Sequence, residues 1–358
     1  MIMDLPPAQL SSPFVAPQAE REASLLTGLN LLTAWHAARC PGYAALLAGV
    51  YGANVRAESL AHVPYLPVRM FKHFELRSVP DEAVVRCLTS SGTTGQQVSR
   101  IFLDAQTSGL QVRALAAIVQ DFIGKQRLPM LIVDQHEIVR GGRADFSARA
   151  AGVLGFSNFG RHHFYALDEH MQPRWNEIAQ FLDTHRGTPI LLFGFTWVIW
   201  QYFLQAAIRD DRRFDLGESS ILVHGGGWKK LADQSVDNPT FKAMLAEQFG
   251  IRRVSNYYGM VEQVGSVFME CETGHFHAPA FADVLMRDFT TLQPSESGAV
   301  EVVSLLPRSY PGHAILTEDM GTVLGTDDCP CGRKGKYFQI HGRIPKAEIR
   351  GCSDVRAT

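Results

Sequence analysis

The sequence predicts an α/β fold with several buried strands, and three observations support this class. Short apolar runs alternate with segments of helical periodicity over most of the chain, as expected where helices connect the strands of a sheet. The 358 residues are 46% hydrophobic and 20% charged, which is typical of a folded globular protein with a large core. Polar segments rich in glycine follow several of the apolar runs, where ligands usually bind in such sheets.

The predicted elements begin with helices and continue with strands. Residues 19–48 carry apolar side chains at helical spacing as far as Pro41-Gly42, so this part is predicted to be helical. The predicted buried strands occupy residues 84–88, 130–134, 189–193, 220–224 and 300–305. We expect one unit with three parts: a helical region at residues 1–75, a core at residues 76–341 and a short tail at residues 342–358. The sequence leaves the oligomeric state open.

The charge pattern argues against nucleic acid as a partner. The formal net charge is -2 and no dense stripe of Lys and Arg is present, whereas a polyanion is normally bound by a strongly basic surface. Residues 1–16 contain Asp4 and three prolines and do not have the basic-then-apolar order of a signal peptide. We therefore expect a cytoplasmic protein.

One apolar segment is long enough to cross a membrane. Residues 187–208 contain no charged side chain, and a span needs about 20 such residues. Pro189 and Gly194 interrupt the segment, however, and no basic cluster flanks it. We predict a buried strand that leads through Gly194 into a helix, and no membrane span.

A run of hydroxyl and glycine residues directly follows the predicted strand at residues 84–88. Its sequence is Thr89-Ser90-Ser91-Gly92-Thr93-Thr94-Gly95. Glycines let the backbone turn tightly around phosphate oxygens, to which hydroxyl and main-chain N–H groups donate hydrogen bonds. The run has neither the Gly-Lys-Ser/Thr ending of a Walker loop nor the dinucleotide fingerprint. We predict a phosphate-binding loop, with a plain polar turn as the alternative.

This loop resembles the phosphate-binding signature of the adenylate-forming superfamily, which includes acyl-CoA synthetases, firefly-type luciferases and peptide-synthetase adenylation domains. Later segments resemble further signatures of that superfamily in the same order. They are the glycine turn Gly225-Gly226-Gly227, the segment with Tyr258, Gly259 and Glu262, the acidic segment with Asp319, and the hinge pair Gly342-Arg343.

The resemblance implies that ATP and Mg²⁺ are the cofactors. Residues 90–95 would surround the phosphates, and the glycine turn would approach the adenine, which stacks on Tyr258. Asp319 would bind the ribose hydroxyls, Glu262 would hold Mg²⁺, and Arg343 would act at the hinge. Taken singly, each of these residues could have a different role: Glu262 could cap a helix or face solvent, Asp319 could lie in a turn, and Arg343 could form a surface salt bridge.

Two positions depart from the superfamily pattern. Val98 stands where the loop usually carries a lysine, and Val261 stands where the later segment usually has a threonine. Arg100 is a candidate for the missing positive charge. These departures keep open a catalytically silent acyl- or nucleotide-binding subunit as an alternative function.

Within the superfamily the chain is most similar to the LuxE-type acyl-protein synthetases of the bacterial bioluminescence fatty acid reductase. The resemblance covers most of the chain and rests on the loop and on residues 65–72, 224–230, 256–259 and 350–354. It implies the large amino-terminal domain of an adenylate-forming enzyme without the small carboxyl-terminal lid, so that residues 76–341 are the adenylating core and residues 342–358 a truncated hinge.

The same resemblance implies an activity. A long-chain fatty acid would be activated to acyl-AMP and transferred to Cys352, and the thioester would pass to an NADPH-dependent acyl reductase partner. A thiolate in a short tail is a suitable nucleophile for an activated acyl group, although Cys352 could also be an unremarkable tail cysteine. The alternative enzymes are an acyl- or aryl-CoA ligase and an enzyme that loads a carrier-protein thiol. The identity of the acid stays open.

A second group of cysteines suggests a metal site. Cys271 is followed by His275 and His277, and later by Cys329 and Cys331. Thiolates and one imidazole, contributed by two separated segments, suit a closed tetrahedral zinc site of structural role. Phenylacetate-CoA ligases have a similar arrangement. The sequence does not choose between His275 and His277, and reduced, buried thiols are the alternative.

Aromatic residues could line a tunnel for an alkyl chain, since such a site should be concave and apolar. The candidates are Phe156, Phe159 and the aromatic residues between positions 193 and 203. Core packing is the preferred interpretation for most of them.

Overall fold

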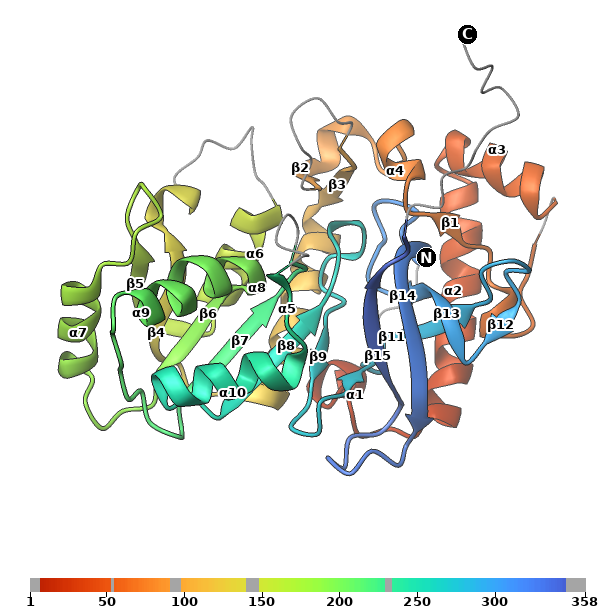
Figure 1. The fold of residues 1–358 in the computed structure, drawn as a ribbon. Helices are drawn as coiled ribbons and strands as arrows, with labels where there is room; N and C mark the ends of the chain where they lie inside the picture. Colours follow the sequence, from red (N-terminus) through yellow and green to blue (C-terminus); the bar gives the residue numbers. More distant parts are fainter. Residues whose placement is uncertain (1–6, 53–54, 91–97, 140–147, 229–233, 346–358) are drawn as a thin grey trace, which may run out of the picture.

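A computed structural model of the chain describes residues 7–52, 55–90, 98–139, 148–228 and 234–345. One mixed sheet runs through the molecule, with parallel strands at one end, antiparallel strands at the other and helices packed around it (Figure 1). The order of its strands is β12-β11-β13-β14-β15-β10-β9-β8-β7-β6-β4-β5, and β1 pairs with β14. The predicted α/β class is confirmed.

The parallel half consists of strands in the order β5-β4-β6-β7-β8. Three of them, β4, β6 and β7, correspond to predicted apolar runs. Their bounds are β4 (Leu128–Gln135), β5 (Gly160–Leu167), β6 (Leu191–Phe195), β7 (Ile221–Gly225) and β8 (Arg253–Tyr258). The longer helices that connect these strands are α6 (Ala148–Ser157), α7 (Trp175–Thr184) and α10 (Asn238–Phe249). Strands β4 and β7 are buried almost throughout, as expected for parallel strands covered on both faces.

The antiparallel half carries the remaining strands. They are β9 (Phe268–Glu270), β10 (Phe276–His277), β11 (Ala282–Arg287), β12 (Pro294–Ser295), β13 (Ser297–Ser304), β14 (Ala314–Thr326) and β15 (Lys336–Arg343). A short early strand, β1 (Leu66–Pro67), pairs in parallel with β14. The strands predicted near residues 130–134, 189–193, 220–224 and 300–305 are therefore confirmed, with shifted ends.

Helices and a separate hairpin form the amino-terminal part. The helices are α1 (Pro7–Ser11), α2 (Gln18–Ala37), α3 (Pro41–Val50), α4 (Met70–His73) and α5 (Ala105–Ile123), and the hairpin is β2 (Val84–Thr89) with β3 (Arg100–Asp104). The helical structure predicted for residues 19–48 is confirmed, but Pro41 starts a second helix there. A proline is favourable at this position because the first helical residue needs no N–H donor. The strand predicted at residues 84–88 belongs to this two-stranded sheet.

The apolar segment at residues 187–208 is a strand followed by helical turns, as predicted. Strand β6 is followed by α8 (Thr196–Val198), the π-helical turn η4 (Ile199–Leu204) and α9 (Gln205–Arg209). Among the residues that the structure describes, no helix is both long and apolar enough to span a membrane.

The aromatic residues considered for an alkyl tunnel pack in the core. Phe156 of α6 stacks on Phe193 of β6, with 4.5 Å between ring centroids, and lies 4.9 Å from the ring of Tyr257. Phe193 and Phe203 are buried. Core packing, the preferred interpretation of these side chains, is confirmed.

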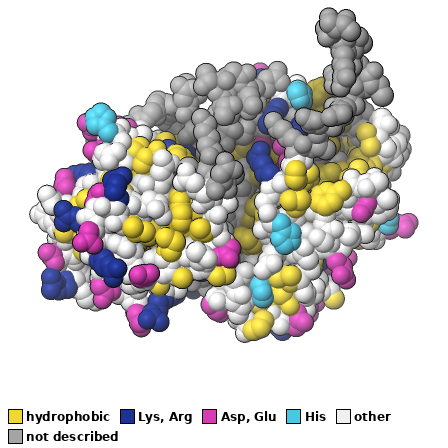
Figure 2. All heavy atoms as spheres, in the orientation of Figure 1, with side chains coloured by type: hydrophobic (Ala, Val, Ile, Leu, Met, Phe, Trp, Pro, Cys, Tyr) yellow, Lys and Arg dark blue, Asp and Glu magenta, His cyan; other side chains and the backbone are white. Residues whose placement is uncertain are grey.

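On the face drawn in Figure 2, acidic and basic side chains are intermixed over the parallel half of the molecule. This agrees with the small net charge of the chain.

Two stacked histidines join α2 to the segment before β14. The rings of His36 and His313 lie 5.1 Å apart, at 21° to each other. His36 Nδ1 is 2.7 Å from the Ser78 hydroxyl, and His313 Nε2 is 3.0 Å from the Thr33 hydroxyl. Burial lowers the pKa of His313 to about 3, and burial together with His313 lowers the pKa of His36.

These histidines should make stability depend on pH. Their pKa values are lower in the folded chain than the ordinary value near 6.5, so below about pH 6.5 the unfolded chain binds more protons. The free energy of unfolding should fall as the pH decreases, by up to about 1.4 kcal/mol per pH unit for each histidine. Denaturant titrations between pH 7 and pH 4.5 measure this slope.

A matched pair of variants isolates the effect. His313→Gln should lower stability at pH 7 and make the dependence on pH shallower. His170→Gln changes an exposed histidine and should leave both unchanged. Equal slopes in the two variants would show that His313 does not control the acid sensitivity.

Candidate functional site

Two of the predicted segments meet at one edge of the sheet. Gly225 ends β7 and Tyr258 ends β8, and these strands are parallel neighbours in which Gly225 lies opposite Tyr257. A Cβ atom on Gly225 would lie within 3 Å of the Tyr257 ring, so the backbone packs directly on that ring. Gly226 follows with a φ of 78°, which favours glycine. A Cβ atom on Gly227 would have no other atom within 4 Å, so the space beside this residue is open.

Tyr258 contacts the predicted ribose-binding residue. Its hydroxyl donates to Asp319 Oδ2 over 2.8 Å. Burial and the charge of Asp319 raise the pKa of Tyr258 well above its usual range, so the hydroxyl stays protonated as a donor. Asp319 lies within β14, which excludes the turn considered as an alternative.

Asp319 also neighbours the predicted hinge arginine. In the β14–β15 ladder, the Cα partner of Asp319 is Arg343. Burial raises the pKa of Asp319, while the Tyr258 hydrogen bond and the charge of Arg343 oppose that rise. The structure thus brings Tyr258, Asp319 and Arg343 together from three strands.

Glu262 lies in a short turn (Val261–Gln263) just after β8 and is only 6% exposed, so it does not face solvent. Burial raises the pKa of its carboxyl group, and the Ser99 hydroxyl and the charges of Lys72 and Arg343 oppose the rise. Within the described part of the chain, no ion pair engages Glu262. A buried carboxylate is costly without a partner, and Mg²⁺ prefers such oxygen ligands. The side chain therefore fits a magnesium ligand.

Lys72 is a site residue that the sequence analysis did not identify. Strand β1 runs beside β14, with Leu66 opposite Ile315, and the Arg69 guanidinium pairs with Glu318. Lys72 follows in α4, and its charge opposes the rise that burial causes in the pKa of Glu262. The signal that could have indicated Lys72 is the pair of basic residues, Arg69 and Lys72, that follows Pro67.

Arg100, the candidate for the missing charge of the loop, is engaged elsewhere. Its guanidinium lies 3.3 Å from the carboxylate of Glu75, and both side chains are exposed.

The base of the predicted phosphate loop lies beside Glu262. The Ser90 N–H donates to the Ser99 carbonyl over 3.1 Å, and the Ser99 N–H donates to the Ser90 hydroxyl over 2.9 Å. These bonds close the end of the β2–β3 hairpin. The Ser99 hydroxyl at this end is the one that opposes the rise in the pKa of Glu262. The other loop residues, Ser91, Gly92, Thr93, Thr94 and Gly95, lie outside the described residues, as does Cys352.

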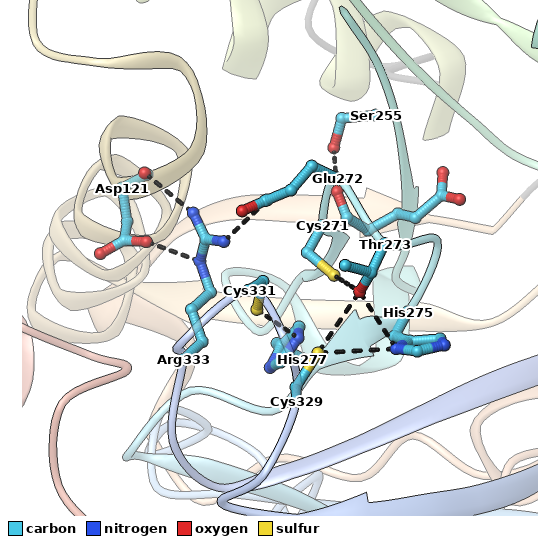
Figure 3. A network of polar contacts seen from close by, with 11 residues as sticks. Asp121, Ser255, Cys271, Glu272, Thr273, His275, His277, Cys329, Cys331 and Arg333 are labelled. Atoms are coloured by element: carbon cyan, nitrogen blue, oxygen red, sulfur yellow. Dashed lines mark hydrogen bonds and ion pairs between the residues drawn. The ribbon is translucent and has the colours of Figure 1, made fainter.

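The cysteine–histidine cluster forms at a different place, between the β9–β10 hairpin and the loop after β14 (Figure 3). The donor atoms of Cys271, His277, Cys329 and Cys331 all lie within 4.8 Å of one another. The structure thus selects His277 over His275 as the histidine of this group.

Comparison with known proteins identifies the family of the chain. The family model described as "Acyl-protein synthetase, LuxE" matches residues 48–358. The long-chain-fatty-acid–luciferin-component ligase of Vibrio harveyi is 26% identical over 322 residues, which are 84% of this chain and 79% of the relative. The enzyme of the same name from Aliivibrio fischeri is 24% identical over 315 residues, covering 82% and 78%.

A similar solved structure is the open conformation of 2-hydroxyisobutyryl-CoA ligase in complex with 2-HIB-AMP and CoA. The TM-score is 0.71 at 19% identity, over 97% of this chain and 81% of that one. The same ligase in its thioesterification state gives a TM-score of 0.68 at 18% identity, over 97% and 74%. These likenesses show a shared fold. Since the family model covers most of the chain, the protein belongs to the LuxE acyl-protein synthetase family.

Proposed function

We propose that this protein activates a long-chain fatty acid as acyl-AMP and then transfers the acyl group to a thiol of its own chain. The observation that carries the proposal is the meeting of Tyr258, Asp319, Glu262 and Arg343 at the sheet edge beside the base of the hydroxyl-rich loop. The names of the two relatives, both long-chain-fatty-acid ligases, support the choice of acid.

The site divides into a nucleoside end and a phosphate end. At the nucleoside end, the open space beside Gly227 would admit an adenine next to Tyr258, and the Asp319 carboxylate would accept hydrogen bonds from the ribose. At the phosphate end, loop residues 90–95 would donate hydrogen bonds, and Glu262 would hold Mg²⁺. The metal would offset the charge of the triphosphate.

Lys72 and Arg343 supply positive charge at the phosphate end. Both act on Glu262, and Lys72 would take the role of the lysine that is absent at Val98. A fixed cation stabilises the charge that develops on the phosphates while the adenylyl group is transferred to the carboxylate.

The reaction would proceed in two steps. An oxygen of the fatty carboxylate attacks the α-phosphorus and pyrophosphate leaves, which gives the mixed anhydride. The Cys352 thiolate then attacks the acyl carbon, the thioester forms and AMP leaves. An NADPH-dependent acyl reductase would consume the thioester. The competing proposals are transfer to CoA or to a carrier thiol, and a binding role without catalysis.

The first test is exchange of labelled pyrophosphate into ATP. The protein should catalyse exchange that depends on a long-chain fatty acid. Lys72→Met should lower kcat/KM for ATP by at least about tenfold, since one cation facing the phosphates is lost. Lys125→Met, at an exposed lysine beyond the end of α5, should exchange at the parental rate.

Two outcomes would count against the proposal. Absence of exchange with every acid tried would favour a binding subunit. Equal rates for the two lysine variants would exclude Lys72 from the phosphate end while leaving the activity itself intact.

The second test concerns the acyl acceptor. After incubation with ATP, Mg²⁺ and mixed fatty acids, the intact mass should rise by the mass of one fatty acid less one water, and Cys352→Ala should abolish the gain. Cys87→Ala is the matched control, because burial raises the pKa of the Cys87 thiol and makes it a poor nucleophile at neutral pH. Should Cys352→Ala form acyl-CoA as fast as the parent, the acceptor is CoA.

A further inference from the structure

The cysteine–histidine cluster lies apart from the nucleotide residues. Cys271 precedes β10 on the β9–β10 hairpin, His277 is in β10, and Cys329 and Cys331 are in the loop between β14 and β15. The two segments are separated by more than 50 residues in the chain, yet their donor atoms all lie within 4.8 Å.

The spacing of the donors fits one tetrahedral ion. In such a site, Zn–S bonds of about 2.3 Å place two sulfur atoms about 3.8 Å apart. The distance from Cys331 Sγ to His277 Nε2 is 3.3 Å, and the largest donor separation is no more than 4.8 Å. Small side-chain movements would therefore bring all four donors onto a common centre.

Burial explains why the cluster needs a ligand. His277 is fully buried, Cys271 is 1% exposed and Cys329 is 4% exposed. His277 Nε2 faces the Cys331 sulfur over 3.3 Å, so an imidazole nitrogen and a thiol share one largely buried space. Buried polar groups are normally satisfied, and a metal ion is the partner that three sulfurs and an imidazole select.

The backbone turns in the same way in both segments that carry the cysteines. The Gly274 N–H donates to the Cys271 carbonyl over 2.9 Å, and the Gly332 N–H donates to the Cys329 carbonyl over 2.9 Å. Both glycines have a φ of 85°, a value that favours glycine. Each segment is thus a tight turn that starts at a cysteine.

Neighbouring residues hold these turns in place. The Thr273 hydroxyl lies 3.0 Å from Cys271 Sγ, 3.4 Å from Cys329 Sγ and 3.2 Å from His275 Nδ1. Arg333 donates to Asp121 of α5 over 2.8 Å and to Glu272 of the hairpin over 3.2 Å (Figure 3). Outer contacts of this kind orient the ligands of a metal.

We propose that Cys271, His277, Cys329 and Cys331 bind one Zn²⁺ ion, which fastens the β9–β10 hairpin to the β14–β15 loop. All four positions are taken by protein side chains, so the ion has a structural role and no open site for substrate. His275 is an outer residue: its Nδ1 lies 3.5 Å from Cys329 Sγ. The proposal does not depend on the proposed ligase activity.

The experiment compares the two histidines. Protein purified without chelator from zinc-containing medium should hold about one zinc per chain by elemental analysis. His277→Ala should lose most of this zinc. His275→Ala should keep it, because loss of an outer contact weakens binding by about 10- to 100-fold and a structural site binds far more tightly than occupancy requires.

Measurements on the parent protein cover the case in which His277→Ala fails to fold. Titration of the thiols with a mercurial should release one zinc per chain, and a strong chelator should lower the melting temperature. Co²⁺ exchanged into the site should give the visible absorption of a tetrahedral thiolate complex. Protein without zinc and without this absorption would overturn the proposal, and so would zinc loss in His275→Ala but not in His277→Ala. A mass lighter by two hydrogens would also overturn it, because it would indicate a disulfide.

Discussion

Strand β8 pairs in parallel with β7 and antiparallel with β9, and the candidate nucleotide site depends on this change of direction. On one side, it places the ends of β7 and β8 at a common edge. On the other, it continues the sheet into β14 and β15, so that Asp319 reaches the Tyr258 hydroxyl. Residues 61 positions apart in the chain thus share a hydrogen bond.

Charge at this edge is balanced by residues from separate elements. Glu262 and Asp319 are carboxyl groups whose pKa values are raised by burial, and Arg343 opposes the rise at both. Lys72 acts on Glu262 from the amino-terminal part of the chain. A bound nucleotide and its metal would enter a site in which both signs of charge are already fixed, so little reorganisation is needed during reaction.

The cysteine–histidine cluster and the nucleotide site occupy opposite ends of the long β14–β15 ladder. Asp319 and Arg343 pair at one end, and Thr326 pairs with Lys336 at the other, next to the loop with Cys329 and Cys331. The ladder has two irregularities, at residues 320–321 and 323–325. The proposed ion would fasten the loop between β14 and β15 to the β9–β10 hairpin. It would thereby limit movement of these two strands and stabilise the fold.

The sequence by itself determined most of the elements and the family. Short apolar runs and helical patterns are local, so they predicted the strands and the amino-terminal helices, and the order of short motifs indicated the family that the comparisons then showed. The ends of the helices and strands were predicted less accurately than their positions, because a helix boundary such as the one before Pro41 depends on a few weak interactions.

Only the tertiary structure decided which side chains meet. The pairing of β1 with β14 places α4 so that the charge of Lys72 acts on Glu262, and no local pattern contains that relation. The choice of His277 over His275 depends on where the loop after β14 folds back on the hairpin. Such distances are set by strand pairing and register between segments far apart in the chain, whereas the patterns of a sequence report only neighbours along it.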